Sequence, residues 1–385
     1  MTLMNWNWQV ETWPNFTYEI SDDLQQKIYE YGKGAGRLDG IFKQSDLHMK
    51  QELLIDLMVE EAIATSAIEG EYFTDADMRT ALRIELGLSD DSEEDIKDLR
   101  APPLARLMIE ARKAFYVPLS KGMMCAWHEL ILSDPEVCKQ MTVGNWRRVP
   151  VQIVAWSSMG SRRVVFEAPP PERVPKEMAQ FISWFNDTDP NIGSIKMSGP
   201  VRAALAHLYF ESIHPFSDGN GRVGRVLSEK ALFQDLNSPV FISLSPTIEA
   251  RKQDYYKQLS SASTQEMTIT SCIEFFVDVV LEAQAKAEQK LTNALKTEDL
   301  LRRHGAAIND RQRLIIRKMA EDGPAGFIGG LSAKKYMALT GCCKATATRD
   351  LAALLLQGIL EQENRGSATR YLLLLKNDPD LDVKR

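Results

Sequence analysis

Residues 214–225, HPFSDGNGRVGR, constrain the fold of this chain most, because they separate two helical patterns with a polar, glycine-rich loop. The preceding segment 199–213 places Ala, Leu and aromatic residues at helical spacing, and Pro215 predicts that this helix ends just before it. Residues 222–233 again have the spacing of a helix. Between them, residues 219–221 (GNG) predict a tight turn with positive φ at two or three positions. We therefore expect a helix, a loop and a second helix.

The loop and the start of the second helix suit the binding of a polyphosphate. The backbone N–H groups of Gly219, Asn220 and Gly221 are expected to point inward at a helix N-terminus, which forms an anion-binding nest. Arg222 and Arg225 are three residues apart, so they lie on one face of the helix and could both reach the phosphates.

Two further residues of the same segment could supply the chemistry. One carboxylate, that of Asp218, suffices to hold Mg²⁺ when phosphate oxygens and water complete the octahedron. Histidine is largely neutral at pH 7, so His214 could accept a proton from a hydroxyl. Phe216 is expected to face the other way and to anchor the loop in the core. The segment therefore predicts a site that binds a nucleoside triphosphate beside an activated hydroxyl.

The segment has every defining position of the pattern H-x-F-x-D/E-G-N-G-R-x-x-R, and it resembles the signature of the Fic family. Fic enzymes generally transfer AMP from ATP to a Ser, Thr or Tyr hydroxyl of a protein and release pyrophosphate. The resemblance implies that His214 is the base, that Asp218 binds Mg²⁺ or Mn²⁺, and that the glycine–asparagine turn cradles the phosphates. It further implies that Arg222 steadies the phosphates and that Arg225 meets the γ-phosphate.

A second motif lies upstream, where the apolar helical pattern of residues 53–68 ends at a glycine, a residue typical of the position just past a helix. The sequence TSAIEG there resembles the inhibitory motif of Fic proteins, S/T-x-x-x-E-G/N, with Thr65, Glu69 and Gly70 at its defined positions. The resemblance implies that Glu69 competes with the γ-phosphate for Arg225, and we expect a bidentate pair. A solvated helix end is the alternative for Glu69.

Two short β-prone runs, residues 149–154 and 164–166, predict a hairpin joined by residues 157–161. Fic proteins have such a hairpin, the flap, before the catalytic motif, and its exposed edge is thought to hold a target segment by strand addition. A purely structural hairpin is the alternative. The tryptophan-rich start of the chain is expected to pack onto the helices that follow it.

The C-terminal segment predicts three helices followed by two strands, which is the order of a winged helix-turn-helix. Residues 306–375 carry ten Lys and Arg against six Asp and Glu, a net charge of +4, whereas the whole chain carries −7. A basic module of this kind suits attraction to a phosphate backbone. Lys344, Thr346 and Arg349 lie at the start of the third helix, where they could enter a major groove of DNA. Docking to a protein or dimerisation is the alternative for such a domain.

The expected fold class is mainly α: a Fic-type helical core with a β-hairpin flap, and a C-terminal winged helix of the α+β kind. The expected divisions are an N-terminal helical region that contains the inhibitory helix (1–110), a catalytic core (111–280), a connecting helix (281–305), the winged helix (306–376) and a tail (377–385).

Composition indicates the cellular compartment in which we expect this chain. The five cysteines have no metal-ligand spacing, and their odd number argues against a disulfide framework. No segment has the length and hydropathy of a membrane span, and the N-terminus lacks the basic and apolar regions of a signal peptide. We therefore expect a cytoplasmic protein that does not interact with membranes.

Three functions stay open at this stage. The first is transfer of AMP from ATP to a target protein or to the chain itself, with the C-terminal module recruiting targets. The second is regulation of transcription by a DNA-binding protein whose Fic-like core senses a nucleotide. The third is removal of AMP by the same site, with Glu69 orienting water. The target and the oligomeric state, with a homodimer as one arrangement, stay open as well.

Overall fold

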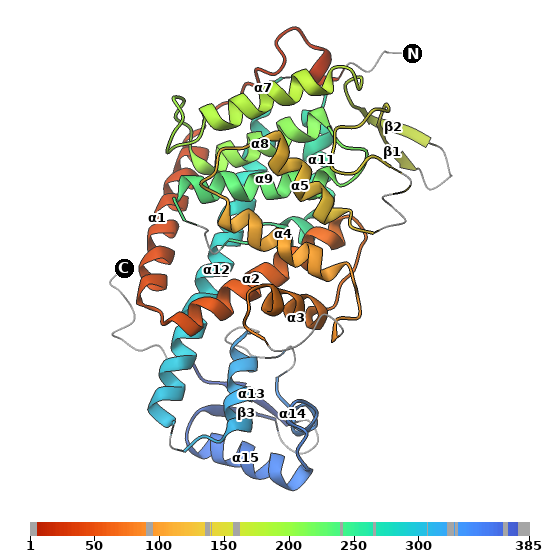
Figure 1. Cartoon of the computed structure of the whole chain (residues 1–385). Helices are drawn as coiled ribbons and strands as arrows, with labels where there is room; N and C mark the ends of the chain where they lie inside the picture. Colours follow the sequence, from red (N-terminus) through yellow and green to blue (C-terminus); the bar gives the residue numbers. More distant parts are fainter. Residues whose placement is uncertain are drawn as a thin grey trace. The chain divides into compact units, whose positions relative to one another are not determined.

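The computed structural model describes residues 6–89, 95–134, 139, 141–156, 162–238, 242–264, 267–305, 307–321, 327, 330–364 and 369–375. Within these residues the chain is mainly helical and contains two small antiparallel sheets of two strands each (Figure 1), so the predicted mainly α class with a β-hairpin is confirmed. The chain divides into two compact units: residues 1–36 with 54–285, and residues 37–53 with 286–385.

The first unit is a helical bundle around one large core. Its helices and those that run on into the second unit are α1 (Asp22–Gln44), α2 (Leu47–Ile68), α3 (Asp75–Glu85), α4 (Ala101–Lys113), α5 (Lys121–Ile131), α7 (Val174–Asp187), α8 (Gly199–Ile213), α9 (Asn220–Asp235), α10 (Ser245–Ala250), α11 (Lys252–Ala262) and α12 (Thr270–His304). A 3₁₀ turn, η1 (Asn7–Gln9), precedes them.

Helix α8 is the centre of this unit, because every residue of it except Glu211 is buried. A helix that is apolar on all sides must be surrounded by others, and α8 packs along α9 and against α7. Both α8 and α9 form where helices were predicted, although α9 begins at Asn220, two residues earlier than expected. The predicted catalytic loop therefore joins the two most buried helices of the unit.

The predicted hairpin consists of β1 (Gln152–Trp156) and β2 (Arg162–Glu167), which pair antiparallel with a register shift between Ile153 and Val154. Trp6 and Trp8 cover this hairpin: the Trp6 ring meets Phe166 edge-on at 5.5 Å, and the indole N–H of Trp8 donates to the Glu167 carbonyl at 2.6 Å. The expected packing onto helices is seen for Trp13, whose ring meets Tyr209 of α8 at 5.2 Å. Trp6 and Trp8 also cover the hairpin, since an isolated two-stranded sheet needs an apolar cover.

Two predicted domain limits fall inside helices. Residue 110 lies within α4 and residue 280 lies within α12, and the predicted division of the chain stays a prediction. The connecting helix expected from residue 281 is the second part of α12, which already begins at Thr270. Its first turns bury Cys272, Ile273 and Phe276, so core packing extends the helix toward the N-terminus.

After α12, the described residues of the second unit form three helices and then a hairpin: α13 (Asp310–Glu321), α14 (Ala333–Thr340), α15 (Lys344–Leu356), β3 (Leu360–Glu363) and β4 (Arg370–Leu373). Ser332 caps α14 by accepting from the Lys335 N–H at 3.1 Å, and Gly341 turns the chain with φ +67° before α15. This order of elements was predicted, whereas the assignment to the winged-helix family stays a prediction. The expected wing loop lies outside the described residues.

Candidate active site

His214 is the residue that ends α8, and its backbone is left-handed with φ 51° and ψ 60°. A residue other than glycine in this conformation costs about 1–2 kcal/mol. Arg147 stabilises the turn: its Nε donates to the His214 carbonyl at 2.7 Å, and its backbone N–H donates to the Pro215 carbonyl at 2.9 Å. The end of α8 is therefore held by a residue from a distant segment.

Arg147 also connects this turn to the hairpin. Its guanidinium donates to the carbonyls of Val149 at 3.0 Å and Pro169 at 2.6 Å, which flank β1 and β2. Burial lowers the pKa of Arg147 to about 10, so the side chain is still charged at pH 7. Sequence reasoning missed this residue, because an arginine between two loops has no local signal of such a role.

The loop after His214 is closed by Asn220. The Asn220 side chain accepts from the Phe216 N–H and donates to the Phe216 carbonyl, both at 2.9 Å. Only Gly219 has a positive φ (74°), and Asn220 and Gly221 are the first helical residues of α9. The expectation of two or three positive φ angles in this turn is wrong, because the Asn220 amide replaces a second tight turn. Asn220 therefore shapes the loop with its side chain.

Phe216 lies in the core, as predicted, and its ring stacks on His128 at 3.9 Å between centroids. His128 Nδ1 accepts from the Gly144 N–H at 3.0 Å, so its Nε2 carries the proton and donates to the Asp218 carbonyl at 3.0 Å. Burial lowers the pKa of His128 to about 4, which keeps the ring neutral. His128 is thus part of the support beneath the loop, a role that the sequence did not indicate.

The start of α9 presents backbone N–H groups that lie before the first helical hydrogen bond. The first helical hydrogen bond here runs from Val223 N–H to the Gly219 carbonyl at 3.2 Å, so the N–H groups of residues 220–222 precede the helical ladder. These groups and the positive end of the helix dipole attract an anion. Asp218 is exposed beside them and accepts from the Gly219 N–H at 2.7 Å.

A single carboxylate at this position fits a shared metal site. The described residues contain no group of three His, Cys, Asp or Glu that could hold a metal by themselves. Asp218 could still bind Mg²⁺ together with the oxygens of a bound triphosphate, since Mg²⁺ is usually held by one or two carboxylates plus phosphates and water.

The carboxylate of Glu69 lies against the start of α9. A Cβ atom added to Gly221 would be 2.5 Å from Glu69 Oε1, so only glycine permits this approach. The same oxygen accepts from Arg225 Nη2 at 2.7 Å. The carboxylate therefore occupies the place where the helix N-terminus attracts an anion.

Thr65 accepts two further hydrogen bonds from the Arg225 guanidinium. Arg225 Nε donates to Thr65 Oγ1 at 2.7 Å, and Nη2 also donates to the Thr65 carbonyl at 2.9 Å. The pair with Glu69 is monodentate, so the expected bidentate geometry is wrong: Thr65 uses the Nε edge of the guanidinium. Arg225 Nη1 is buried without a hydrogen-bond partner among the described residues, so its two N–H donors are not used there.

Gly70 orients the segment that follows α2. Its φ is +84°, and the Glu71 N–H donates to the Ser66 carbonyl at 3.0 Å, a bond typical of glycine-terminated helices. This turn points the Glu71 carboxylate back to Arg222 Nη1, at 3.0 Å. Sequence reasoning missed the contact, although an acidic residue directly after the Glu–Gly pair was visible.

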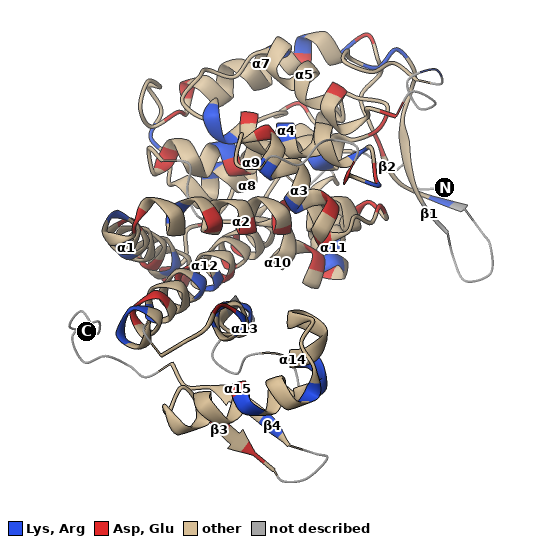
Figure 2. Cartoon of the chain, turned by 60° about the horizontal axis from the view of Figure 1, so that its bottom comes forward, with Lys and Arg blue, Asp and Glu red and all other residues tan. Residues whose placement is uncertain are grey.

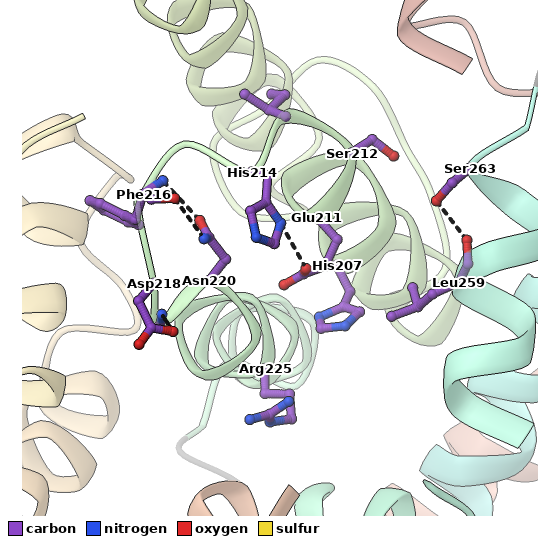
Figure 3. Close-up of polar contacts among 12 residues, drawn as sticks. His207, Glu211, Ser212, His214, Phe216, Asp218, Asn220, Arg225, Leu259 and Ser263 are labelled. Carbon is purple, nitrogen blue, oxygen red and sulfur yellow. Dashed lines mark hydrogen bonds and ion pairs between the residues drawn. The ribbon is translucent and has the colours of Figure 1, made fainter. Parts of the chain in front are cut away.

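The predicted site residues thus fall into two groups. His214, Asp218, Asn220 and Arg225 lie together at the junction of α8 and α9 (Figure 3). Gly219, Gly221 and Arg222 belong to the same junction, at the start of α9. Thr65 and Glu69, at the end of α2, contact Arg225, and Gly70 follows them. Lys344, Thr346 and Arg349 belong to the second unit, at the start of α15, where Lys344 and Arg349 are exposed. Figure 2 shows Lys and Arg in blue on α14 and α15.

Two family models match the chain. Residues 118–232 match the model described as Fic/DOC family, and residues 6–88 match a domain of unknown function, DUF4172. The first match includes α8, the loop and most of α9, and the second includes the end of α2.

Several curated relatives are named protein adenylyltransferase Fic. One from Nematostella vectensis is 33% identical over 119 residues, which is 29% of this chain and 26% of the relative. One from Drosophila grimshawi is 26% identical over 237 residues, which is 60% of this chain and 44% of the relative. The chain therefore spans less than half the length of these relatives.

Solved structures have the same fold. A Fic family protein from Desulfovibrio desulfuricans matches with a TM-score of 0.51 and 23% identity, over 94% of this chain and 99% of that one. A Fic domain containing signaling protein from Bacteroides thetaiotaomicron matches with a TM-score of 0.52 and 18% identity, over 70% of this chain and 97% of that one.

None of the helices in the described residues combines the length and the hydropathy that a membrane-spanning helix needs.

Proposed function

Because this chain contains a Fic/DOC domain, at residues 118–232, we propose that it is a protein adenylyltransferase. It would transfer AMP from ATP to a Ser, Thr or Tyr hydroxyl of a target protein or of the chain itself. The observation that supports this proposal is that His214, at the end of α8, directly precedes the loop to the N-terminus of α9, which carries Arg222 and Arg225. The names of its relatives support ATP as the substrate.

In this proposal the N-terminus of α9 binds the phosphates and the C-terminal end of α8 supplies the base. The N–H groups of residues 220–222, with Arg222 and Arg225, bind the phosphates, and a divalent cation shared with Asp218 would neutralise charge on them. His214 removes the proton of the attacking hydroxyl. The hydroxyl oxygen bonds to the α-phosphorus while the bond from this phosphorus to the bridging oxygen breaks, and pyrophosphate leaves with that electron pair.

The end of α2 would hold this site in an inhibited state. Glu69 and Thr65 engage Arg225 through three hydrogen bonds, and the Glu69 carboxylate lies on Gly221. A γ-phosphate needs the same guanidinium and the same helix end, and two anions repel each other at one site. Productive binding of ATP would therefore require displacement of Glu69.

The hairpin is the proposed place for a target segment. Ile153 on β1 and Val149 before it are exposed, and a two-stranded sheet has free edges to which a strand can be added. Arg147 ties the carbonyls at the base of the hairpin to the carbonyl of His214. A target bound along the hairpin would thus be held in a fixed place relative to the base.

Binding of DNA by the second unit is a second candidate function. Lys344 and Arg349 are exposed in the first two turns of α15, and α13–α15 with the β3–β4 hairpin have the element order of a DNA-binding winged helix. This role and AMP transfer are compatible, since they would use different units of the chain.

One experiment tests the main proposal. The full chain, Glu69→Gly and His214→Ala are each incubated with ATP and Mg²⁺, and intact mass and radiolabel from [α-³²P]ATP are measured. Gain of one AMP by Glu69→Gly, a weaker gain by the unchanged chain and none by His214→Ala are expected. The Glu69→Gly incubation is repeated with added cell extract to offer target proteins. If a folded Glu69→Gly variant that binds ATP labels neither itself nor any protein of the extract, AMP transfer is excluded.

A further inference from the structure

Glu211 is the one residue of α8 that is not fully buried, and it faces His214 from one turn earlier (Figure 3). Its Oε2 atom lies 3.4 Å from His214 Nδ1, within ion-pair distance, and the two side chains are only 12% and 13% exposed. This separation is longer than that of a normal hydrogen bond to nitrogen. Catalytic contacts are often long before the substrate binds and then shorten.

Gly224 of α9 makes the space that Glu211 occupies. A Cβ atom at Gly224 would lie 3.0 Å from Glu211 Oε1 and 2.9 Å from His207 Nδ1, so the two helices meet closely here. His207 is held from its other side by the Tyr255 hydroxyl at 2.7 Å from Nε2. The carboxylate is therefore confined between α8 and α9.

The groups that face Glu211 keep it ionised. Burial alone raises the pKa of a carboxyl, but His214 and His207 on α8 and Arg225 on α9 outweigh burial, and the pKa of Glu211 lies below its ordinary value. Burial lowers the pKa of His207 itself. A carboxylate thus stands beside the proposed base.

A neutral imidazole carries its proton on one nitrogen and accepts on the other. A carboxylate on Nδ1 favours the tautomer with the proton on Nδ1, which leaves Nε2 free to accept. We propose that Glu211 is a positioning residue for His214: it selects this tautomer and stabilises the imidazolium that forms after the substrate proton is taken. The role of Nε2 as acceptor rests on the proposed function.

Two variants separate positioning from packing. Glu211→Gln keeps an oxygen acceptor of the same size, whereas Glu211→Met keeps only the volume. In the Glu69→Gly background, Glu211→Met should lower the kcat of AMP transfer on the order of 10- to 100-fold, part of what a positioned base contributes. Glu211→Gln should keep most of the kcat that Glu211→Met loses. The KM for ATP should stay unchanged in both variants. Equal losses in both variants, or losses in KM alone, would show a merely structural role.

The tautomer itself is measured by ¹⁵N NMR of histidine-labelled full-length protein at pH 7.5, with His214 assigned by its loss in His214→Ala. The expected result is a proton on Nδ1 of His214 in the unchanged chain and a shift toward the other tautomer in Glu211→Met. If Glu211→Met fails to fold, Gly224→Ala replaces it, since the methyl group displaces Glu211. An unchanged tautomer in these variants would overturn the proposal, and absence of AMP transfer would not affect this readout.

A second, independent contact concerns Arg222. Its side chain is only 4% exposed, and Nη1 lies 3.0 Å from Glu71 Oε1, while Nε is buried without a hydrogen-bond partner among the described residues. We propose that Glu71 is a second inhibitory carboxylate, which holds Arg222 away from phosphate as Glu69 holds Arg225. Arg100 Nη1 lies 3.7 Å from Glu71 Oε2 and offers the carboxylate another partner when Arg222 turns to a nucleotide.

The affinity of the full chain for a non-hydrolysable ATP analogue tests this contact by calorimetry, without any need for catalysis. Glu71→Gln should bind the analogue several-fold more tightly, because a partly exposed ion pair no longer competes with the phosphates for Arg222. Glu69→Gln should do the same, and the double variant should bind more tightly than either. Glu85→Gln, which breaks a pair with Arg106 on α3 and α4, is the control. Unchanged affinity in Glu71→Gln beside raised affinity in Glu69→Gln would overturn the proposal.

Discussion

The Glu69 carboxylate accepts a hydrogen bond of 2.7 Å from Arg225, across 156 residues of sequence. Because the same oxygen lies against Gly221, one side chain covers both an arginine and a helix N-terminus that are suited to phosphate. Under the proposed function, this pair would keep a nucleotide site closed until Glu69 is displaced.

Replacing Glu69 by glycine is expected to raise AMP transfer by at least about 10-fold, because loss of one favourable ion pair of roughly 1–2 kcal/mol frees Arg225. Glu69→Gln should give a smaller rise, since the amide keeps an acceptor but no charge. The measurement is the initial rate of label transfer from [α-³²P]ATP. A folded Glu69→Gly variant with an unchanged or lower rate contradicts the inhibitory role. If the site removes AMP, the same change should stop that removal.

Replacing His214 by alanine should lower transfer by about 10²- to 10⁴-fold, the usual contribution of a general base. Binding of ATP should be retained, because His214 lies at the end of α8 and the phosphate donors belong to α9. The exposed residue His48 offers a control, as His48→Ala. Transfer that persists in His214→Ala would assign the base to another group.

Thr65→Val keeps the size and shape of the side chain but removes the oxygen that accepts from Arg225 Nε at 2.7 Å. A buried donor without a partner costs about 1–3 kcal/mol, so α2 should hold the site less firmly. We expect transfer to rise less than in Glu69→Gly, and the free energy of unfolding in urea to fall by about 1–2 kcal/mol. A Thr65→Val variant that matches the unchanged chain in both measurements would remove Thr65 from the inhibitory contact.

The free energy of unfolding should fall at acidic pH because of His128, which supports the loop after His214. His128 has a pKa of about 4 when folded, against 6.5 for an unperturbed histidine. Between these values the unfolded chain binds a proton that the folded chain does not, so stability falls as the pH is lowered and the effect ends below pH 4. The full difference corresponds to roughly 3 kcal/mol.

Urea unfolding at pH 7 and pH 4.5 measures this effect as the difference between the unchanged chain and His128→Gln, since glutamine does not titrate. The unchanged chain should lose more stability than the variant by roughly 2–3 kcal/mol. Equal losses would mean that His128 is not held neutral by its burial.

The DNA hypothesis predicts that the double variant Lys344→Glu, Arg349→Glu weakens binding of the full chain to duplex DNA at low salt. Loss of two phosphate contacts should also reduce the slope of log affinity against log salt by about two. Filter binding at several salt concentrations measures both quantities. If the unchanged chain does not bind DNA at any salt concentration, the second unit has another role.

Local sequence was sufficient to predict where the helices that carry the candidate site end. Pro215 and the glycines of the loop predicted where α8 ends, and Gly70 predicted the end of α2, because such breaks depend on the residues next to them. The start of α12 was missed by about three helical turns, since the helix begins at Thr270 and not at residue 281. Buried apolar residues before position 281 continue a helix of which only the polar part was recognised.

The contiguous pattern from His214 to Arg225 by itself determined which polar groups meet at one helix junction, because backbone geometry keeps near neighbours together. Only the tertiary structure decided that Arg147 holds the His214 carbonyl, that His128 supports Asp218, and that Glu71 reaches Arg222. These contacts join side chains from separate segments, and their geometry follows from how the helices pack, which no spacing within one segment encodes.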